Sequence, residues 1–214
     1  MVTNSPLGLS NPDIVSSPVR QAVVDHVLAH ETLAIAHHSL RTYFFAIKVA
    51  DVRGLRRGVD YHDDALFFAS VLHDLGLSDA GEARPDRFEV AGADLATEFL
   101  AHQGVSSEVL DVVWDAIALH TTFGIADRRG VVCGLVLAGT ALDFGHGSDF
   151  LSDEEAAAIN DAFPRLDINT ALGRSIIAQA ERNRAKAPHL STADYFYRSV
   201  HGFDRSFTSR WGAV

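Results

Sequence analysis

The feature that most constrains the fold is an apolar run from Val131 to Asp143, which reads VVCGLVLAGTALD. Because the run is apolar nearly throughout, it predicts a helix that is buried on all sides at the centre of the protein. A chain built around such a helix needs one sizeable core. The 214 residues, of which 47% are hydrophobic, are enough for one.

Helix start and stop signals divide the rest of the chain. Ser17-Pro18 combines a capping hydroxyl with a proline at the first helical position, and Ser152 with Glu155 forms a capping box. Strand signals are nearly absent, because no stretch of six residues alternates cleanly between apolar and polar. The expected helices cover about 18–30, 39–52, 62–75, 87–102, a stretch capped by Ser106 or Ser107, 131–143, a stretch after 152, 170–186 capped by Asn169, and 192–200.

These signals predict an all-α fold, with about eight or nine helices in a single domain over residues 18–214. Residues 1–17 contain Pro6, Pro12 and several Ser and Asn, which is typical of an extended N-terminal arm. The near-average composition excludes a disordered chain, a collagen-like fibre and a coiled-coil rod.

The charge and the cysteine content bound the partners and the compartment. Eighteen basic and 28 acidic residues give a net charge of −10, which disfavours nucleic-acid and anionic membrane surfaces. The single cysteine, Cys133, lies in an apolar setting and predicts a buried small side chain in a reducing compartment. No signal peptide or membrane-spanning run is visible, so we expect a cytoplasmic protein with a small-molecule substrate.

Histidine and aspartate residues stand where apolar segments begin or end. His38 lies at the expected start of a helix, His73-Asp74 ends one apolar helix, His120 ends another, and Asp143 closes the central run. Burying such carboxylates is costly unless they are paired or bound to a metal. Imidazole and carboxylate together suit Zn²⁺, Fe²⁺ or Mn²⁺. The pattern indicates a metal site, although an HD dipeptide by itself is common.

Five ordered motifs between about residues 31 and 188 carry a resemblance to a known family: HSLRTYFFA, LHDLGL, RFEVAGADLATEFL, AIALHT and GTALDFG. The series H…HD…D resembles the HD-domain superfamily of metal-dependent hydrolases, and the five motifs resemble its cyanamide hydratase-like branch. The resemblance implies a helical fold and a metal held by His38, His73, Asp74 and Asp143. It is also what selects His38 over the neighbouring His37.

The same resemblance implies the number of metals. Some two-metal members carry two further histidines between the HD pair and the last aspartate; here His120 matches the second, whereas Glu89 stands near the place of the first. This departure favours one divalent transition metal, with Zn²⁺ as the first choice and Fe²⁺ or Mn²⁺ as alternatives. If Glu89 or His102 binds metal, the two-metal interpretation returns.

A metal-activated water would add to a nitrile-type substrate such as cyanamide, which gives urea. His120 is the candidate that donates or relays the proton to the nitrogen; in an alternative route Glu89 or Asp74 activates the water. Arg41 is a candidate for pairing with an acid of the site, for substrate binding or for a structural salt bridge. Glu89 could also orient a ligand histidine, and it equally suits the first turn of a helix. Phe123 is a candidate for lining a small apolar cavity.

Three other functions stay open at this point. The alternative to hydration is a phosphohydrolase acting on a nucleotide or small phosphate ester, although such chemistry needs cations and Leu77 stands where many such relatives carry lysine. A two-iron oxygenase and a non-enzymatic HD interaction module are the others. Homo-oligomerisation through the N-terminal arm or the aromatic segment from Tyr195 to Trp211 is a prediction from composition alone.

Overall fold

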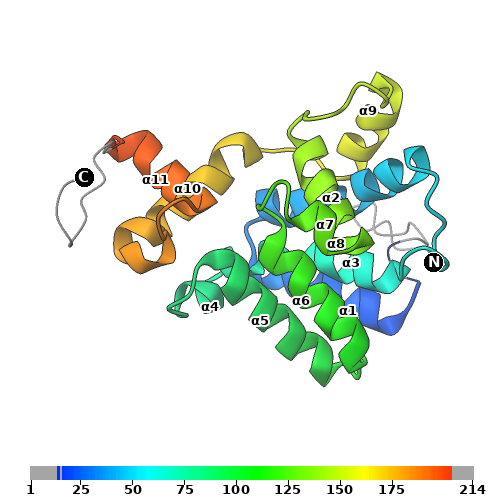
Figure 1. Ribbon diagram of the computed structural model, residues 1–214, viewed down its shortest axis with the longest axis horizontal. Coiled ribbons are helices and arrows are strands. Elements are labelled where there is room, and N and C mark those ends of the chain that lie inside the picture. Colours follow the sequence, from blue (N-terminus) through cyan, green and yellow to red (C-terminus); the bar gives the residue numbers. More distant parts are fainter. Residues whose placement is uncertain (1–13, 15, 204–214) are drawn as a thin grey trace, which may run out of the picture.

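The computed structural model describes residue 14 and residues 16–203, and helices make up this part of the chain (Figure 1). No β-strand forms in the described residues, where an isolated bridge joins Arg57 and Tyr61. The predicted all-α fold is therefore confirmed. The helices of the described part are α1 (Pro18–His30), α2 (Leu33–Val52), α3 (Asp63–Leu72), η1 (Leu75–Leu77), α4 (Asp79–Glu82), α5 (Phe88–His102), α6 (Ser107–Leu119), α7 (Ala126–Arg129), α8 (Val131–Asp143), α9 (Asp153–Ala162), α10 (Ile168–Arg182), η2 (Arg184–Lys186) and α11 (Thr192–His201).

Local signals placed most of these helices correctly. The helix α8 has the predicted bounds, and α1 begins at Pro18, where the Ser17 hydroxyl accepts a hydrogen bond from the Arg20 amide. The capping box of Ser152 and Glu155 is present at the start of α9. Nine α-helices in the described part have ten or more residues, which agrees with the predicted eight or nine. The other two, α4 and α7, have four residues each.

Four helix ends differ from the predictions, one of them at α10, which ends at Arg182 rather than at residue 186. The helix α2 begins at Leu33 rather than near residue 39, because Thr32 caps it, so His38 lies within the helix and not at its start. The helix α3 ends at Leu72 rather than near residue 75, and His73 is its C-cap residue. The residue before α10 is Asp167, so Asn169 lies inside the helix and does not cap it.

The buried helix α8 lies at the centre, in contact with α2, α3, α6 and α7 (Figure 1). Its Leu135 and Val136 are fully buried, and Cys133 is buried as predicted. The helices α10 and α11 contact each other and lie to one side of this bundle. They join it where Ile168 of α10 packs with Ile35 of α2. The site described below is positioned by both parts.

The helices α2 and α8 approach most closely at Gly139, where a β-carbon would lie 2.5 Å from the Thr42 carbonyl oxygen. Replacing Gly139 by alanine should therefore separate the two helices and lower the free energy of unfolding by about 1–3 kcal/mol. Urea denaturation measures the effect. Gly134→Ala on the same helix is the matched control: its β-carbon would meet nothing closer than 3.4 Å, so helix propensity should raise stability by up to about 1 kcal/mol. Equal effects would contradict the proposed packing.

A second close approach fixes the segment after His73. A β-carbon on Gly76 would lie 1.9 Å from the carbonyl oxygen of Phe88, so η1 can rest directly on the first turn of α5 only because residue 76 is glycine. This contact holds His73 and Asp74 beside the start of α5 and explains why α3 does not continue to residue 75.

The arm predicted over residues 1–17 lies almost entirely outside the described residues, as does the part of the aromatic C-terminal segment beyond residue 203. The domain boundary at residue 18 and homo-oligomerisation through these segments stay predictions. Among the described helices, none is both long and apolar enough to cross a membrane.

Candidate metal centre

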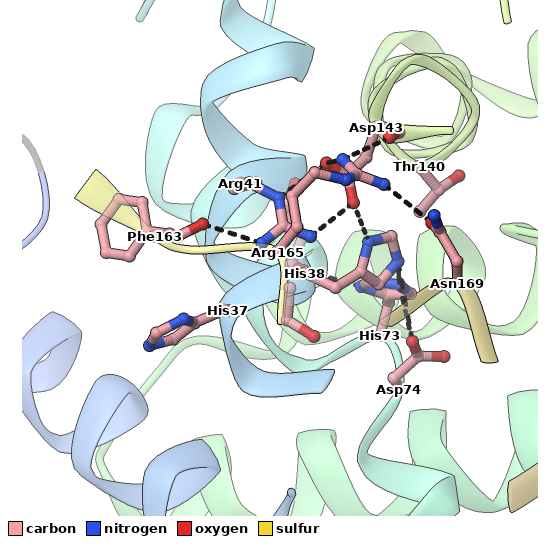
Figure 2. Close-up of polar contacts among 12 residues, drawn as sticks. His37, His38, Arg41, His73, Asp74, Thr140, Asp143, Phe163, Arg165 and Asn169 are labelled. Atoms are coloured by element: carbon pink, nitrogen blue, oxygen red, sulfur yellow. Dashed lines mark hydrogen bonds and ion pairs between the residues drawn. The ribbon is translucent and has the colours of Figure 1, made fainter. Parts of the chain in front are cut away.

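Three of the four predicted metal ligands converge beneath α8. His38 comes from α2, His73 caps the end of α3, and Asp74 follows it (Figure 2). Each contributes one ligand atom, and these atoms lie within 4.8 Å of one another. All three residues are buried. Sequence positions 35 residues apart thus meet at one point, as the motif predicted.

The spacing of the three ligand atoms fits a small divalent ion. His73 Nε2 lies 3.2 Å from His38 Nε2 and 3.2 Å from Asp74 Oδ2, and His38 Nε2 lies 3.8 Å from Asp74 Oδ2. Ligand atoms about 2.1 Å from a tetrahedral ion lie roughly 3.4 Å from each other. The three separations bracket that value, so one ion fits between these atoms without a change of fold.

Hydrogen bonds on the outer side of the rings fix the histidine tautomers. Nδ1 of His38 donates to Asp143 Oδ2 at 2.6 Å, Nδ1 of His73 donates to the Ser70 carbonyl at 2.8 Å, and Nδ1 of His120 donates to the Ile117 carbonyl at 2.6 Å. Because these acceptors carry no proton, Nδ1 carries it in each ring. In the neutral ring Nε2 then presents a lone pair to the cluster, which is the tautomer a metal needs.

The surroundings set the protonation of these groups. Burial lowers the pKa of His38 and, together with His73, lowers the pKa of His120 to about 4, so both rings are neutral at neutral pH. Burial also lowers the pKa of His73, but the adjacent Asp74 carboxylate outweighs it and raises that pKa above its usual value. Burial raises the pKa of Asp74, and the histidines around it hold it well below its usual value. The cluster therefore attracts a cation.

One buried oxygen supports the same conclusion. Asp74 Oδ2 is buried and accepts no hydrogen bond from any described residue, although it lies between His38 and His73. An ionised oxygen without a hydrogen-bond donor is costly in a protein interior, whereas a metal ion would satisfy it. The donor set thus fits a divalent ion bound by nitrogen and oxygen.

Asp143, the fourth predicted ligand, lies behind His38 rather than among these atoms (Figure 2). Its carboxylate accepts hydrogen bonds from His38, from two nitrogens of Arg41 at 2.7 and 2.8 Å, and from Arg165 at 2.9 Å. Burial raises the pKa of Asp143, but Arg41 and His38 hold it well below its usual value. In this arrangement the carboxylate orients the His38 ring. Its role as a direct ligand stays a prediction.

Arg41 pairs with Asp143, so it makes the contact with an acid of the site that was one of its predicted roles. The residue is fully buried, and its third nitrogen donates to the carbonyls of Phe163 and Pro164. All three nitrogens therefore bond to protein groups. The neighbouring His37 points away from the cluster, where its Nδ1 donates to the Pro164 carbonyl (Figure 2). This orientation gives a physical reason for choosing His38 over His37.

Glu89 is buried at the start of α5 but is held by its own partners. Its carboxylate accepts hydrogen bonds from two nitrogens of Arg87 and one from the Thr121 hydroxyl at 2.8 Å. Burial raises the pKa of Glu89, but Arg87 and then His120 bring it below its usual value. Glu89 does not belong to the group of residues that can share a metal, and its catalytic role stays a prediction.

A cavity lies next to the cluster, where His120 contacts the predicted ligands and Phe123 lines the cavity wall. His120 Nε2 lies 3.8 Å from Asp74 Oδ1, the carboxylate oxygen turned away from His38 and His73, and its ring packs edge-on against His73. His120 and Phe123 both line a cavity of about 330 Å³. The structure thus brings His120 next to the predicted ligands, and it brings Phe123 only to the cavity wall.

Sequence analysis missed several residues around the site. Arg165 bonds to the Asp143 carboxylate, Asn169 accepts a hydrogen bond from Arg165, and the ring of Phe144 lies 5.1 Å from that of His38. Phe144 stands directly after Asp143, so its place could have been inferred. Arg165 follows the end of α9 in a segment without periodicity, and no local signal marks it.

Comparisons with known proteins agree with the motif. A family model described as the HD domain matches residues 35–160. The chain is similar to two proteins of Saccharomyces cerevisiae, cyanamide hydratase DDI2 and cyanamide hydratase DDI3. Each is 25% identical to it over 205 residues, which cover 93% of this chain and 88% of the relative.

Proposed function

The chain belongs to the HD domain family, and from that premise we propose that it hydrates a small nitrile of the cyanamide type. The family match and the similarity to the two yeast proteins support a metal-dependent enzyme of the HD hydrolase or hydratase type. The observation that carries the proposal is the convergence of two Nε2 lone pairs on the unpartnered Asp74 oxygen.

His38, His73 and Asp74 are the proposed ligands, and Asp143 is proposed to hold His38 in place or to join them. HD domains bind divalent metals; Zn²⁺ is our first choice for this site, and Fe²⁺ and Mn²⁺ suit the same donor atoms. Such an ion lowers the pKa of water bound to it to roughly 7, which supplies a nucleophile at neutral pH.

His120 is the proposed proton relay. Its Nδ1 is fixed as a donor to Ile117, so Nε2 is the atom that can exchange protons. Nε2 lies 3.8 Å from Asp74 Oδ1, and His120 also lines the cavity. Because its pKa is lowered to about 4, the ring is neutral at neutral pH and has a free Nε2, and any imidazolium that forms during turnover gives its proton up readily to the nitrile nitrogen. The Glu89 carboxylate, held by Arg87 and Thr121, adds negative charge near His120.

The charges at the site favour this reaction over phosphate ester hydrolysis. Phosphoryl transfer needs cationic side chains for the phosphate oxygens. Among the described residues that line the cavity beside His120, none is arginine or lysine. Arg41 is buried against Asp143, and Arg165 is paired with the same carboxylate. Within residues 16–203, no cationic side chain lines this cavity to bind a phosphate group, which supports hydration over the phosphohydrolase alternative.

An activity panel with metal analysis tests the proposal. Purified protein should carry a divalent metal and release urea from cyanamide, with no phosphate released from nucleoside monophosphates. Phosphate release without urea would replace the proposal with the phosphohydrolase. Iron content coupled to oxygen uptake would replace it with the oxygenase, and protein that binds no metal and turns over no substrate would leave an interaction module.

Replacing His120 by alanine tests the relay. We expect kcat for urea release to fall by about 10²–10⁴-fold, the usual contribution of a positioned acid or base, while the metal content stays that of the unaltered protein. Steady-state kinetics and elemental analysis on the same sample give both values. A variant that loses the metal as well would make His120 a ligand and contradict the one-metal arrangement.

A further inference from the structure

The cavity beside the cluster has walls from both parts of the fold. It has a volume of about 330 Å³ and begins at His120, whose Nε2 faces Asp74. Phe123 and Phe144 form its walls on the side of the central bundle, and Leu172 of α10 and Phe196 of α11 form the opposite side. The ring of Phe144 also packs on that of His38, so two lining residues, His120 and Phe144, connect the cavity with the cluster.

The lining of this cavity is mainly apolar and aromatic. Among the described lining residues there is no aspartate, glutamate, lysine or arginine. Phe123 is 71% exposed and Phe144 is 37% exposed, so two large aromatic residues at this cavity stand open to solvent. Exposed aromatic walls around a few polar groups are typical of a site that takes an apolar ligand.

The cavity is also larger than cyanamide requires. At about 30 Å³ for a water molecule, 330 Å³ corresponds to on the order of ten heavy atoms, whereas cyanamide has three. Cyanamide is polar throughout and would leave the four apolar walls in contact with water. The space and its lining therefore match a substrate with a ring-sized apolar group beside the reacting carbon.

We propose that the substrate is a substituted cyanamide, R–NH–C≡N, whose apolar group R occupies this cavity. This inference rests on the proposed hydration. In the reaction, the water oxygen forms a double bond to the nitrile carbon, and the carbon–nitrogen triple bond becomes a single bond. Both protons of water pass to the terminal nitrogen, which gives R–NH–CO–NH₂ with no other reactant. His120 stands where the cavity meets the cluster, so it reaches the nitrile end while R points toward Leu172 and Phe196.

A second cavity supplies a matched control. It has a volume of about 450 Å³ and lies on the other side of Phe123, but none of the cluster residues lines it. Phe150 lines that second cavity and not the cavity beside His120, and the residue is 39% exposed. Phe123 lines both cavities, so Phe150→Ala and Phe123→Ala both remove a phenyl group from the second cavity, but of these two variants just Phe123→Ala changes the cavity beside His120.

The test compares kcat/KM for phenylcyanamide and for cyanamide in the metal-loaded full chain. We expect phenylcyanamide to be preferred at least tenfold, Phe123→Ala to lower this ratio at least threefold, and Phe150→Ala to leave the ratio unchanged. An equal or higher value for cyanamide would overturn the inference while leaving hydration intact, as would a preference that Phe123→Ala does not alter. If neither compound is hydrated, the proposed function fails and this inference fails with it.

Discussion

Replacing His73 by alanine should remove the metal and lower the rate of urea release by more than about 100-fold. Changes that only affect residues supporting metal ligands cost up to about 100-fold, and the loss of a ligand should exceed that. His73 is central to the cluster because its Nε2 lies 3.2 Å from both His38 Nε2 and Asp74 Oδ2. Without it, the two remaining ligands lie 3.8 Å apart with an open side.

The matched control for this experiment is His37→Ala. His37 is also a buried histidine, one residue from His38, but it bonds to the Pro164 carbonyl and points away from the cluster (Figure 2). We expect His37→Ala to keep its metal and most of its activity. Circular dichroism should show both variants folded. Full activity in a folded His73→Ala protein would remove the basis of the proposed chemistry.

Arg41→Met should lower the free energy of unfolding by about 3–5 kcal/mol, the usual effect of breaking a buried ion pair from one side. Arg41 and Asp143 are both fully buried at the side chain, and two hydrogen bonds join them. Methionine keeps much of the volume but leaves the carboxylate with Arg165 and His38 alone. Urea denaturation at pH 7 measures the loss.

Arg174→Met is the control, because Arg174 pairs with Asp167 on the surface, where its side chain is 66% exposed. Exposed pairs contribute little, so the unfolding midpoint should stay almost unchanged. A similar small effect for Arg41→Met would contradict the role of the buried pair.

The pH dependence of the free energy of unfolding gives a second test of the same pair. The pKa of Asp143 is held below its usual value in the fold, so its stabilisation is present above about pH 4 and is lost as the pH falls. Arg41→Met should reduce that loss.

Local chemistry explains why so much of the helical framework was predictable. The ends of α8, the Ser17 cap and the Ser152 capping box all follow from residues within one turn. The predicted helix ends are wrong where contacts between residues distant in sequence determine where a helix stops. The helix α3 stops early because Gly76 rests on α5, a contact that no local pattern reveals.

The site was predictable to the extent that it depends on the motif. His38, His73 and Asp74 meet as expected, and His120 lies beside them. The surroundings of Asp143 were not predictable, because its three partners come from α2 and from the segment before α10. The sequence left Arg41 open between pairing with an acid of the site, binding substrate and a structural salt bridge, and only the buried contacts show that it pairs with Asp143.

The walls of the cavity show the same limit. Leu172 and Phe196 reach the site only because α10 and α11 pack together beside the bundle. In the sequence, each of them stands where the apolar face of any amphipathic helix could place a large apolar residue. The proposed substrate contacts therefore depend on tertiary packing, whereas the proposed metal ligands follow from the motif.

Metal titration of the metal-free protein tests the central claim most directly. Isothermal calorimetry with Zn²⁺ should show one ion bound per chain in the unaltered protein. It should show no comparable binding after Asp74→Asn, which keeps the shape of the side chain but removes the charge that His38 and His73 face. One tightly bound ion in both proteins, or none in the unaltered chain, would contradict a shared metal at these three residues.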